Sequence, residues 1–187
     1  MKKIIYFTNT AESLVTLRMG LMKSMKNEGY DVYAGAPRDN NFEIIMNQKI
    51  CFHNVTMSQT GMNVFEEVRS IINFIKVLRK VKPDIIHFFS VKPIVLGGLA
   101  SIFFPNRKVI STFTGLGVLK NCGFWMRKIL FKIIKLSHNS KKIYVFQNHS
   151  DLDFFQKHTK IRERTYMISG SGVDIDSFKQ THDKKSD

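Results

Sequence analysis

Short apolar runs alternate along the chain with longer segments whose apolar residues recur every three or four positions. The runs are almost continuously apolar, as Lys3 to Thr8 (KIIYFT) and Asp84 to Phe89 (DIIHFF) illustrate. Such runs are typical of strands in a parallel sheet that is buried on both faces. The other predicted strands are Asp31 to Ala36, Ile50 to Val55, Lys108 to Phe113, Lys142 to Gln147 and a short candidate at Thr165 to Ile168.

The segments between these runs have helical periodicity. The clearest is Val64 to Val81, and Ser13 to Glu28 is a second, with Ser13 as its predicted N-cap and Leu14, Leu17, Leu21 and Met25 as its predicted inward stripe. The other predicted helices are Phe42 to Asn47, Ile94 to Phe103, Leu119 to Leu136 and Ser150 to Lys157. Because strands and helices alternate, the pattern predicts an α/β fold, a doubly wound Rossmann-like parallel sheet of about six to seven strands.

In such a sheet, ligands bind outside the carboxyl ends of the strands, so the residues that follow each strand are the candidate site. Arg18, one turn inside the first helix, could hold a phosphate or a carboxylate, and the alternative is an ordinary surface arginine. Lys92 would point a cation at the same edge, whereas His87 within its strand is interpreted as a core residue. The substrate-binding candidates are Thr10, Ser13, Arg18, Lys92, Thr114, Gly115, Gly117 and Asn148.

The sequence lacks the motifs of several kinds of binding and catalytic site. The first strand-to-helix loop lacks the GxGxxG and Walker patterns, so a tightly held dinucleotide is not predicted. Cys51 and Cys122 are interpreted as free thiols, and no metal site or cofactor is predicted. No arrangement of residues identifies a catalytic group, so the catalytic residues stay unassigned.

The chain has 187 residues, of which 43% are hydrophobic, so it can bury a core of its own. Its net charge of +14 would attract nucleic acid, anionic lipid or a phosphorylated substrate. No nucleic-acid-binding motif is present and most aromatic residues are spaced as core residues, which argues against a nucleic-acid partner.

The basic residues are concentrated between Val118 and Lys142, a stretch without any acidic residue. Met126, Ile129, Leu130 and Ile133 form the predicted inward stripe of its helix. Aromatic residues among lysines on the other face suit an anionic membrane surface, and the alternative is a solvated basic face. The predicted membrane contacts are Phe124, Trp125, Lys128, Phe131, Lys132 and Lys135.

The chain shows no signal peptide, and its apolar, uncharged stretch from Pro93 to Asn106 is too short to span a bilayer. We therefore expect a cytoplasmic protein that is peripheral on the inner face of the membrane.

Five stretches together resemble the N-terminal domain of a GT-B fold, family 4 glycosyltransferase of bacterial surface polysaccharide biosynthesis. The resemblance covers essentially the whole chain. The stretches are Ser13 to Pro37, Pro83 to Ala100, TFTGLG at Thr112 to Gly117, Val145 to Phe155, and GSGVDIDSF at Gly170 to Phe178.

The resemblance implies two Rossmann-like domains that face each other across a cleft. Residues 1–178 would form the acceptor-side domain, 179–187 would be a polar, disordered tail, and the C-terminal donor domain would be absent from the chain. The implied reaction transfers a hexose from a nucleotide-sugar to a saccharide or to a polyprenyl-diphosphate-linked sugar, in capsule or lipopolysaccharide synthesis.

The nucleotide-sugar would be a co-substrate bound mainly by a donor-binding domain or subunit, without a metal ion, and the isolated chain is expected to be inactive. The alternatives are a non-catalytic acceptor- or membrane-binding subunit that recruits a separate donor-binding partner, and a basic nucleic-acid-binding module.

Overall fold

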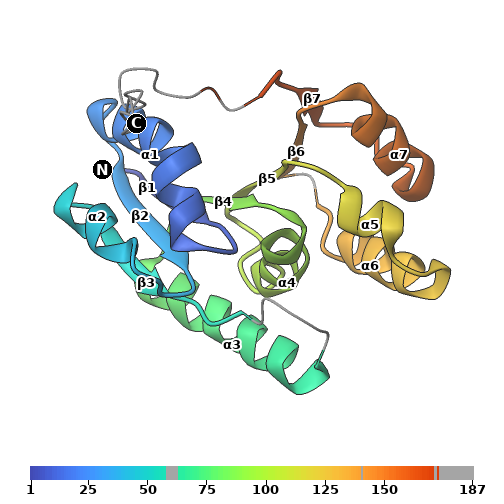
Figure 1. Ribbon diagram of the computed structural model, residues 1–187, viewed down its shortest axis with the longest axis horizontal. Helices are drawn as coiled ribbons and strands as arrows, with labels where there is room; N and C mark the ends of the chain where they lie inside the picture. The colour runs from blue at the N-terminus through green and yellow to red at the C-terminus, as the bar shows by residue number, and fades with distance from the viewer. Residues whose placement is uncertain (58–62, 140, 171, 173–187) are drawn as a thin grey trace, which may run out of the picture.

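The computed structural model describes residues 1–57, 63–139, 141–170 and 172. Its strands form one seven-stranded parallel sheet in the order β3-β2-β1-β4-β5-β6-β7 (Figure 1), which confirms the predicted Rossmann-like architecture. The predicted tail at 179–187 lies outside the described residues. The strands are β1 (Lys3–Phe7), β2 (Asp31–Ala36), β3 (Cys51–Asn54), β4 (Ile85–Phe89), β5 (Lys108–Phe113), β6 (Lys142–Phe146) and β7 (Thr165–Met167).

Helices cover the sheet on both sides. α1 and α2 pack on one face, over β1 and β2, whereas α3, α4, α6 and α7 pack on the other. The central strand β1 is buried on both faces, because Ile4 and Tyr6 enter one core cluster and Ile5 and Phe7 enter the other. The helices are α1 (Ala11–Asn27), α2 (Phe42–Asn47), α3 (Val64–Val81), α4 (Val91–Ser101), α5 (Gly117–Asn121), α6 (Phe124–Leu136) and α7 (His149–Thr159).

The first helix differs from its prediction in cap and in orientation. Thr10, and not Ser13, is the N-cap, and its hydroxyl accepts a hydrogen bond from the backbone N–H of Ser13 at 3.1 Å. The residues that α1 buries against the sheet are Ala11, Leu14, Arg18 and Met22, and Leu17 and Leu21 are exposed. Leu14 and Met25 do pack on the core, so the stripe was right for these two residues. It was wrong for Leu17 and Leu21, because Arg18 occupies an inward position, which periodicity of apolar residues does not register.

The predicted helix Leu119 to Leu136 is broken at Cys122 and Gly123, whose extended backbone separates α5 from α6. The Arg127 guanidinium donates to the carbonyl oxygens of Leu119 at 3.0 Å and of Lys120 at 2.7 Å. These carbonyls belong to the last turn of α5, where no following helical N–H group can donate to them. Arg127 supplies the missing donors and so stabilises the break.

Because α6 starts anew after this break, its buried face is rotated from the predicted one. Phe131 is only 4% exposed, and its ring stacks on His158 of α7 with centroids 4.9 Å apart. Ile129 is 53% exposed instead. The prediction of Phe131 as an outward membrane contact and of Ile129 as a core residue was therefore wrong.

Asp151 fixes the loop after β5 to the start of α7. One carboxylate oxygen accepts hydrogen bonds from the Leu116 N–H at 3.0 Å and from the Asn148 side chain at 2.9 Å, and the other pairs with Lys120 at 2.7 Å. Burial alone raises the pKa of Asp151, but these hydrogen bonds outweigh it and hold the pKa below its ordinary value. Asn148 is the N-cap of α7, which therefore starts at His149, one residue before the predicted start.

Gly97 lets α4 pack directly against β4. A Cβ at this position would lie 2.6 Å from Cζ of Phe88, a fully buried ring. We expect Gly97→Ala to lower the free energy of unfolding by about 1–3 kcal/mol, since the core has no room for the methyl group. Gly20→Ala in α1, where a Cβ meets nothing within 4 Å, is the control and should stabilise the chain. Equal denaturation midpoints for the two variants would contradict this packing.

The Asp151 contacts should make stability depend on pH. A carboxylate with a lowered folded-state pKa contributes stability above its ordinary pKa of 3.8 and loses it as the pH falls through the folded-state value. We expect Asp151→Asn to cost about 1–3 kcal/mol at pH 7, and the cost to shrink below pH 3.8, as urea denaturation measures. Asp153→Asn, an exposed change in the same helix, should cost less than about 0.5 kcal/mol. A cost for Asp151→Asn that does not change with pH would rule out the ionic contribution.

Candidate functional site

The strand order reverses between β1 and β4, and this switch point is where an open α/β sheet binds its ligands. The loop after β1 leads through Thr10 into α1, and β4 leads through Ser90 into α4. The structure thereby brings Thr10, Ser13, Arg18 and Lys92 to this part of the carboxyl edge, from two separate stretches of chain.

Arg18 projects from α1 towards β4 and is only 3% exposed. The carbon of its guanidinium lies 4.2 Å from the centre of the Phe89 ring, at the carboxyl end of β4. One terminal nitrogen donates to the Leu17 carbonyl at 3.3 Å, whereas Nε is buried without a hydrogen-bond partner. Within the described part of the chain no carboxylate pairs with this cation.

Burial lowers the pKa of Arg18 from its ordinary value, yet an arginine stays charged at neutral pH. A buried charge without a counter-charge costs stability. Such an arrangement is typical of a site whose counter-charge arrives with the ligand.

Lys92 lies in the first turn of α4, since this helix starts earlier than predicted. Its ammonium forms an ion pair with Oε1 of Glu67 in the first turn of α3, at 2.7 Å. Oε2 of Glu67 is buried and has no hydrogen-bond partner among the described residues. Glu67 was missed by sequence reasoning, because an acidic residue in a first turn also suits the helix dipole. The second carboxylate oxygen of Glu67 offers an acceptor to a polar ligand.

Ser90 links β4 to α4 in a strained conformation. Its φ of 69° and ψ of 156° lie in a region that is almost restricted to glycine. Strain of this kind gathers at ligand sites, where the surrounding structure imposes it. Sequence reasoning could not find it, because a serine before a helix predicts an ordinary N-cap.

His87 lies below this site, within the sheet. Its Nε2 is 2.8 Å from the Thr112 hydroxyl, and its ring stacks on Phe89 with centroids 4.0 Å apart. Burial, and secondarily the charge of Arg18, lowers the pKa of His87 to about 3, so the ring is neutral at pH 7. His87 is a core residue, as predicted.

The other predicted binding residues lie farther along the carboxyl edge, at the ends of β5 and β6. Thr114, Gly115 and Gly117 are exposed, and neither glycine has a positive φ. The Asn148 side chain bonds to Asp151 through both its amide nitrogen and its oxygen. Asn148 is therefore a capping residue, and the turn after β5 lies beside the end of β4, where the Ser90 N–H donates to the Thr112 carbonyl at 3.3 Å.

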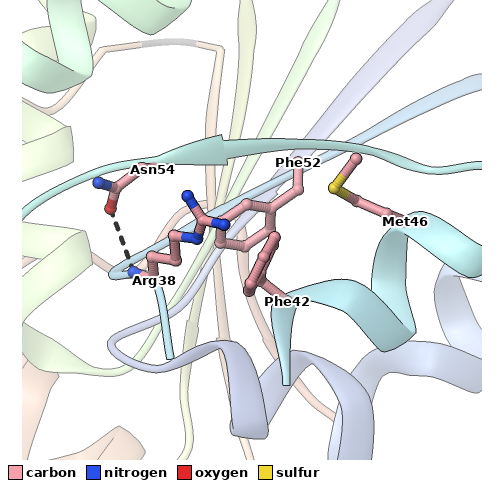
Figure 2. A pocket seen from close by; sticks show the side chains of 5 residues that line it. All are labelled: Arg38, Phe42, Met46, Phe52 and Asn54. Atoms are coloured by element: carbon pink, nitrogen blue, oxygen red, sulfur yellow. Dashed lines mark hydrogen bonds between the residues drawn. The ribbon is translucent and has the colours of Figure 1, made fainter. Parts of the chain in front are cut away.

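A separate hollow of about 310 Å³ lies at the ends of β2 and β3. Figure 2 shows the Arg38 side chain over the Phe42 ring, 3.9 Å from its centre, and the hydrogen bond from the Arg38 backbone to Asn54. Met46 and Phe52 complete the lining. No sequence motif pointed to this hollow, which lies at the edge of the sheet.

Among the described residues, no three His, Cys, Asp or Glu side chains gather where they could hold a metal ion. None of the helices in this part of the chain combines the length and the apolarity needed to cross a lipid bilayer.

Solved structures share this fold at low sequence identity. A glycosyltransferase from Rickettsia africae superposes with a TM-score of 0.68 at 18% identity over 94% of the chain. Alr3699/HepE of Anabaena, solved with UDP and glucose, has a TM-score of 0.66 at 14% identity over 97% of the chain. A putative UDP-N-acetylglucosamine 2-epimerase from Listeria monocytogenes has a TM-score of 0.63 at 12% identity over 88% of the chain. The chain spans 44%, 47% and 44% of these structures, respectively. Because an epimerase is among them, the fold alone does not specify the reaction.

The sequence itself is more specific. No curated protein sequence matches the chain, but residues 3–148 match the model of one protein family, described as glycosyl transferase 4-like. The matched stretch contains the whole switch point, with Arg18, Glu67, Ser90 and Lys92. The chain therefore belongs to the glycosyl transferase 4-like family.

Proposed function

We propose that the chain is the acceptor-side half of a glycosyltransferase that moves a hexose from a nucleotide-sugar to a polyprenyl-diphosphate-linked sugar or another saccharide. The product would be a surface polysaccharide, such as a capsule or a lipopolysaccharide. A second domain or subunit would hold the nucleotide-sugar, a proposal supported by the 44% of the Rickettsia africae glycosyltransferase that the chain spans. The reaction would take place on the inner face of the membrane, where the polyprenyl carrier resides.

The observation that carries this proposal is the buried, uncompensated charge of Arg18 at the switch point. A diphosphate bound there would supply the missing counter-charge. The N-terminus of α1 would add a favourable dipole, although its Glu12 N–H already donates to an Asp39 carboxylate oxygen at 3.1 Å and its Ser13 N–H to the Thr10 hydroxyl. Both contributions are electrostatic and need no metal ion.

Glu67 and Lys92 would orient the sugar next to this diphosphate. The unpaired oxygen of Glu67 can accept a hydrogen bond from a sugar hydroxyl, and Lys92 holds the carboxylate in place. In the transfer, an acceptor hydroxyl oxygen bonds to the anomeric carbon of the donor sugar, the bond from that carbon to the nucleoside diphosphate breaks, and the hydroxyl proton is released. The contribution of this chain would be to position the acceptor.

Arg18→Met tests the site, because methionine keeps the length of the side chain and removes the charge. With farnesyl diphosphate and farnesyl-diphosphate-N-acetylglucosamine as probes, we expect calorimetric affinity to fall at least about tenfold, or about 1.4 kcal/mol. The free energy of unfolding of the unliganded variant should stay equal or rise, since an unpaired buried charge is lost. Lys23→Met, an exposed change in the same helix, should alter neither quantity.

Equal probe binding by Arg18→Met and the wild type would show that Arg18 does not hold the anion. No binding of either probe to the wild type would overturn the acceptor proposal itself. Transfer can be tested by reading the gene and its neighbours beyond codon 187 for a nucleotide-sugar-binding half, and assaying both halves together with radiolabelled UDP-sugars. We expect transfer only with both halves present, and less of it with Arg18→Met.

A further inference from the structure

α6 exposes an apolar stripe that the switch-point site does not use. Trp125, Ile129 and Leu136 are 74%, 53% and 65% exposed. Since a helix turns about 100° per residue, these positions fall within about 40° of one another. Figure 1 shows α5, α6 and α7 together at the end of the molecule opposite α2 and β3.

Lysines run alongside this stripe. Lys128, Lys132 and Lys135 are exposed on its flank, and none of them forms an ion pair with another described residue. The Lys128 ammonium lies 4.3 Å from the centre of the Phe124 ring and 5.4 Å from that of Trp125. These cation–π contacts hold a positive charge at the level of the exposed aromatic pair.

A groove of about 440 Å³ separates these lysines from α7. Phe131 and His158, stacked with their rings 15° from parallel, are among its lining residues, and Lys157 adds a cation from α7. Arg127 also lines the groove, but its nitrogens are bound to carbonyl oxygens at the end of α5. No acidic residue lines it, so the groove is suited to an anion.

We infer that α6 docks on a bilayer that contains anionic phospholipid, with Trp125, Ile129 and Leu136 in the interface and a headgroup phosphate in the groove among the lysines. Membrane-surface helices combine these features, an apolar face buried among acyl chains and basic residues at headgroup level. A nucleic acid would use the lysines but would leave the exposed aliphatic side chains without a role. The inference rests on α6 and α7 alone and does not depend on the proposed transfer reaction.

Trp125 is the sole tryptophan of the chain, so its fluorescence reports directly on this surface. We expect the emission to shift to shorter wavelength with phosphatidylcholine vesicles that contain about one third phosphatidylglycerol, in about 0.15 M salt. Brominated acyl chains should quench it, and pure phosphatidylcholine should have little effect. An unchanged spectrum with anionic vesicles would overturn the inference.

Charge reversal tests the groove. Lys128→Glu with Lys132→Glu should weaken vesicle binding, measured by sedimentation, by at least about 30-fold, since each basic residue near an anionic surface contributes about 1 kcal/mol. Lys76→Glu with Lys80→Glu, an exposed pair with the same spacing on α3, is the matched control and should bind as the wild type. Equal losses in both variants would reveal general charge attraction and overturn the site, provided that circular dichroism shows both folded.

Ile129→Asn leaves every charged residue and Trp125 unchanged, so it tests the contribution of the apolar stripe to vesicle binding separately from charge. We expect weaker vesicle binding and less quenching by brominated lipid. Binding unaffected by this change, or competed fully by glycerol 1-phosphate, would mean that the groove takes a free phosphate and not a membrane. Tighter binding to duplex DNA than to anionic vesicles would assign the lysines to nucleic acid instead.

Discussion

The pairing of β1 with β4 is the contact on which the rest of this molecule depends. Asp84 begins it, because its carboxylate accepts a hydrogen bond from the Lys3 N–H at 2.8 Å and its own N–H donates to the Lys3 carbonyl at 2.9 Å. The ladder that follows places Phe7 beside Phe88, and both strands send side chains into the core cluster on each face of the sheet. The same pairing creates the switch point, where α1 and α4 diverge and Arg18 and Lys92 arrive from distant parts of the sequence.

Features that cost stability gather at this point. Arg18 is charged and buried, one oxygen of Glu67 is buried and bonds to no other residue that the structure describes, and Ser90 has a strained backbone. The surrounding packing offsets these costs, since Phe7, Phe74 and Phe88 interlock on the face that α3 and α4 cover, with ring centroids 5.0 to 5.8 Å apart. A rigid core beside polar and charged groups that lack partners within the described chain is typical of a site prepared for a ligand.

The sequence predicted the fold more fully than the site. Apolar runs and helical periods located every strand and the alternation, because burial on both faces leaves a strong pattern. Arg18 was predicted as a binding candidate, and that role stays a prediction; its burial was not predicted, since an arginine inside an apolar stripe resembles a surface residue. The break at Gly123 and the burial of Phe131 follow from contacts of Arg127 and His158, which lie outside the local pattern. The strain at Ser90 and the unpaired oxygen of Glu67 arise only in three dimensions.

The position of β1 in the middle of the sheet also has a consequence for synthesis on the ribosome. β1 ends at Phe7, but its second neighbour β4 begins only at Ile85. At about 5–20 residues per second, roughly 4–16 seconds pass before that neighbour has been translated. Throughout this interval β1 is an outer strand, with unpaired backbone groups and with Ile5 and Phe7 still lacking their cover from β4 and α3. The nascent chain thus exposes a strand edge and apolar side chains early in synthesis. A chaperone that shields them would act on about the first forty residues, well before any substrate site exists.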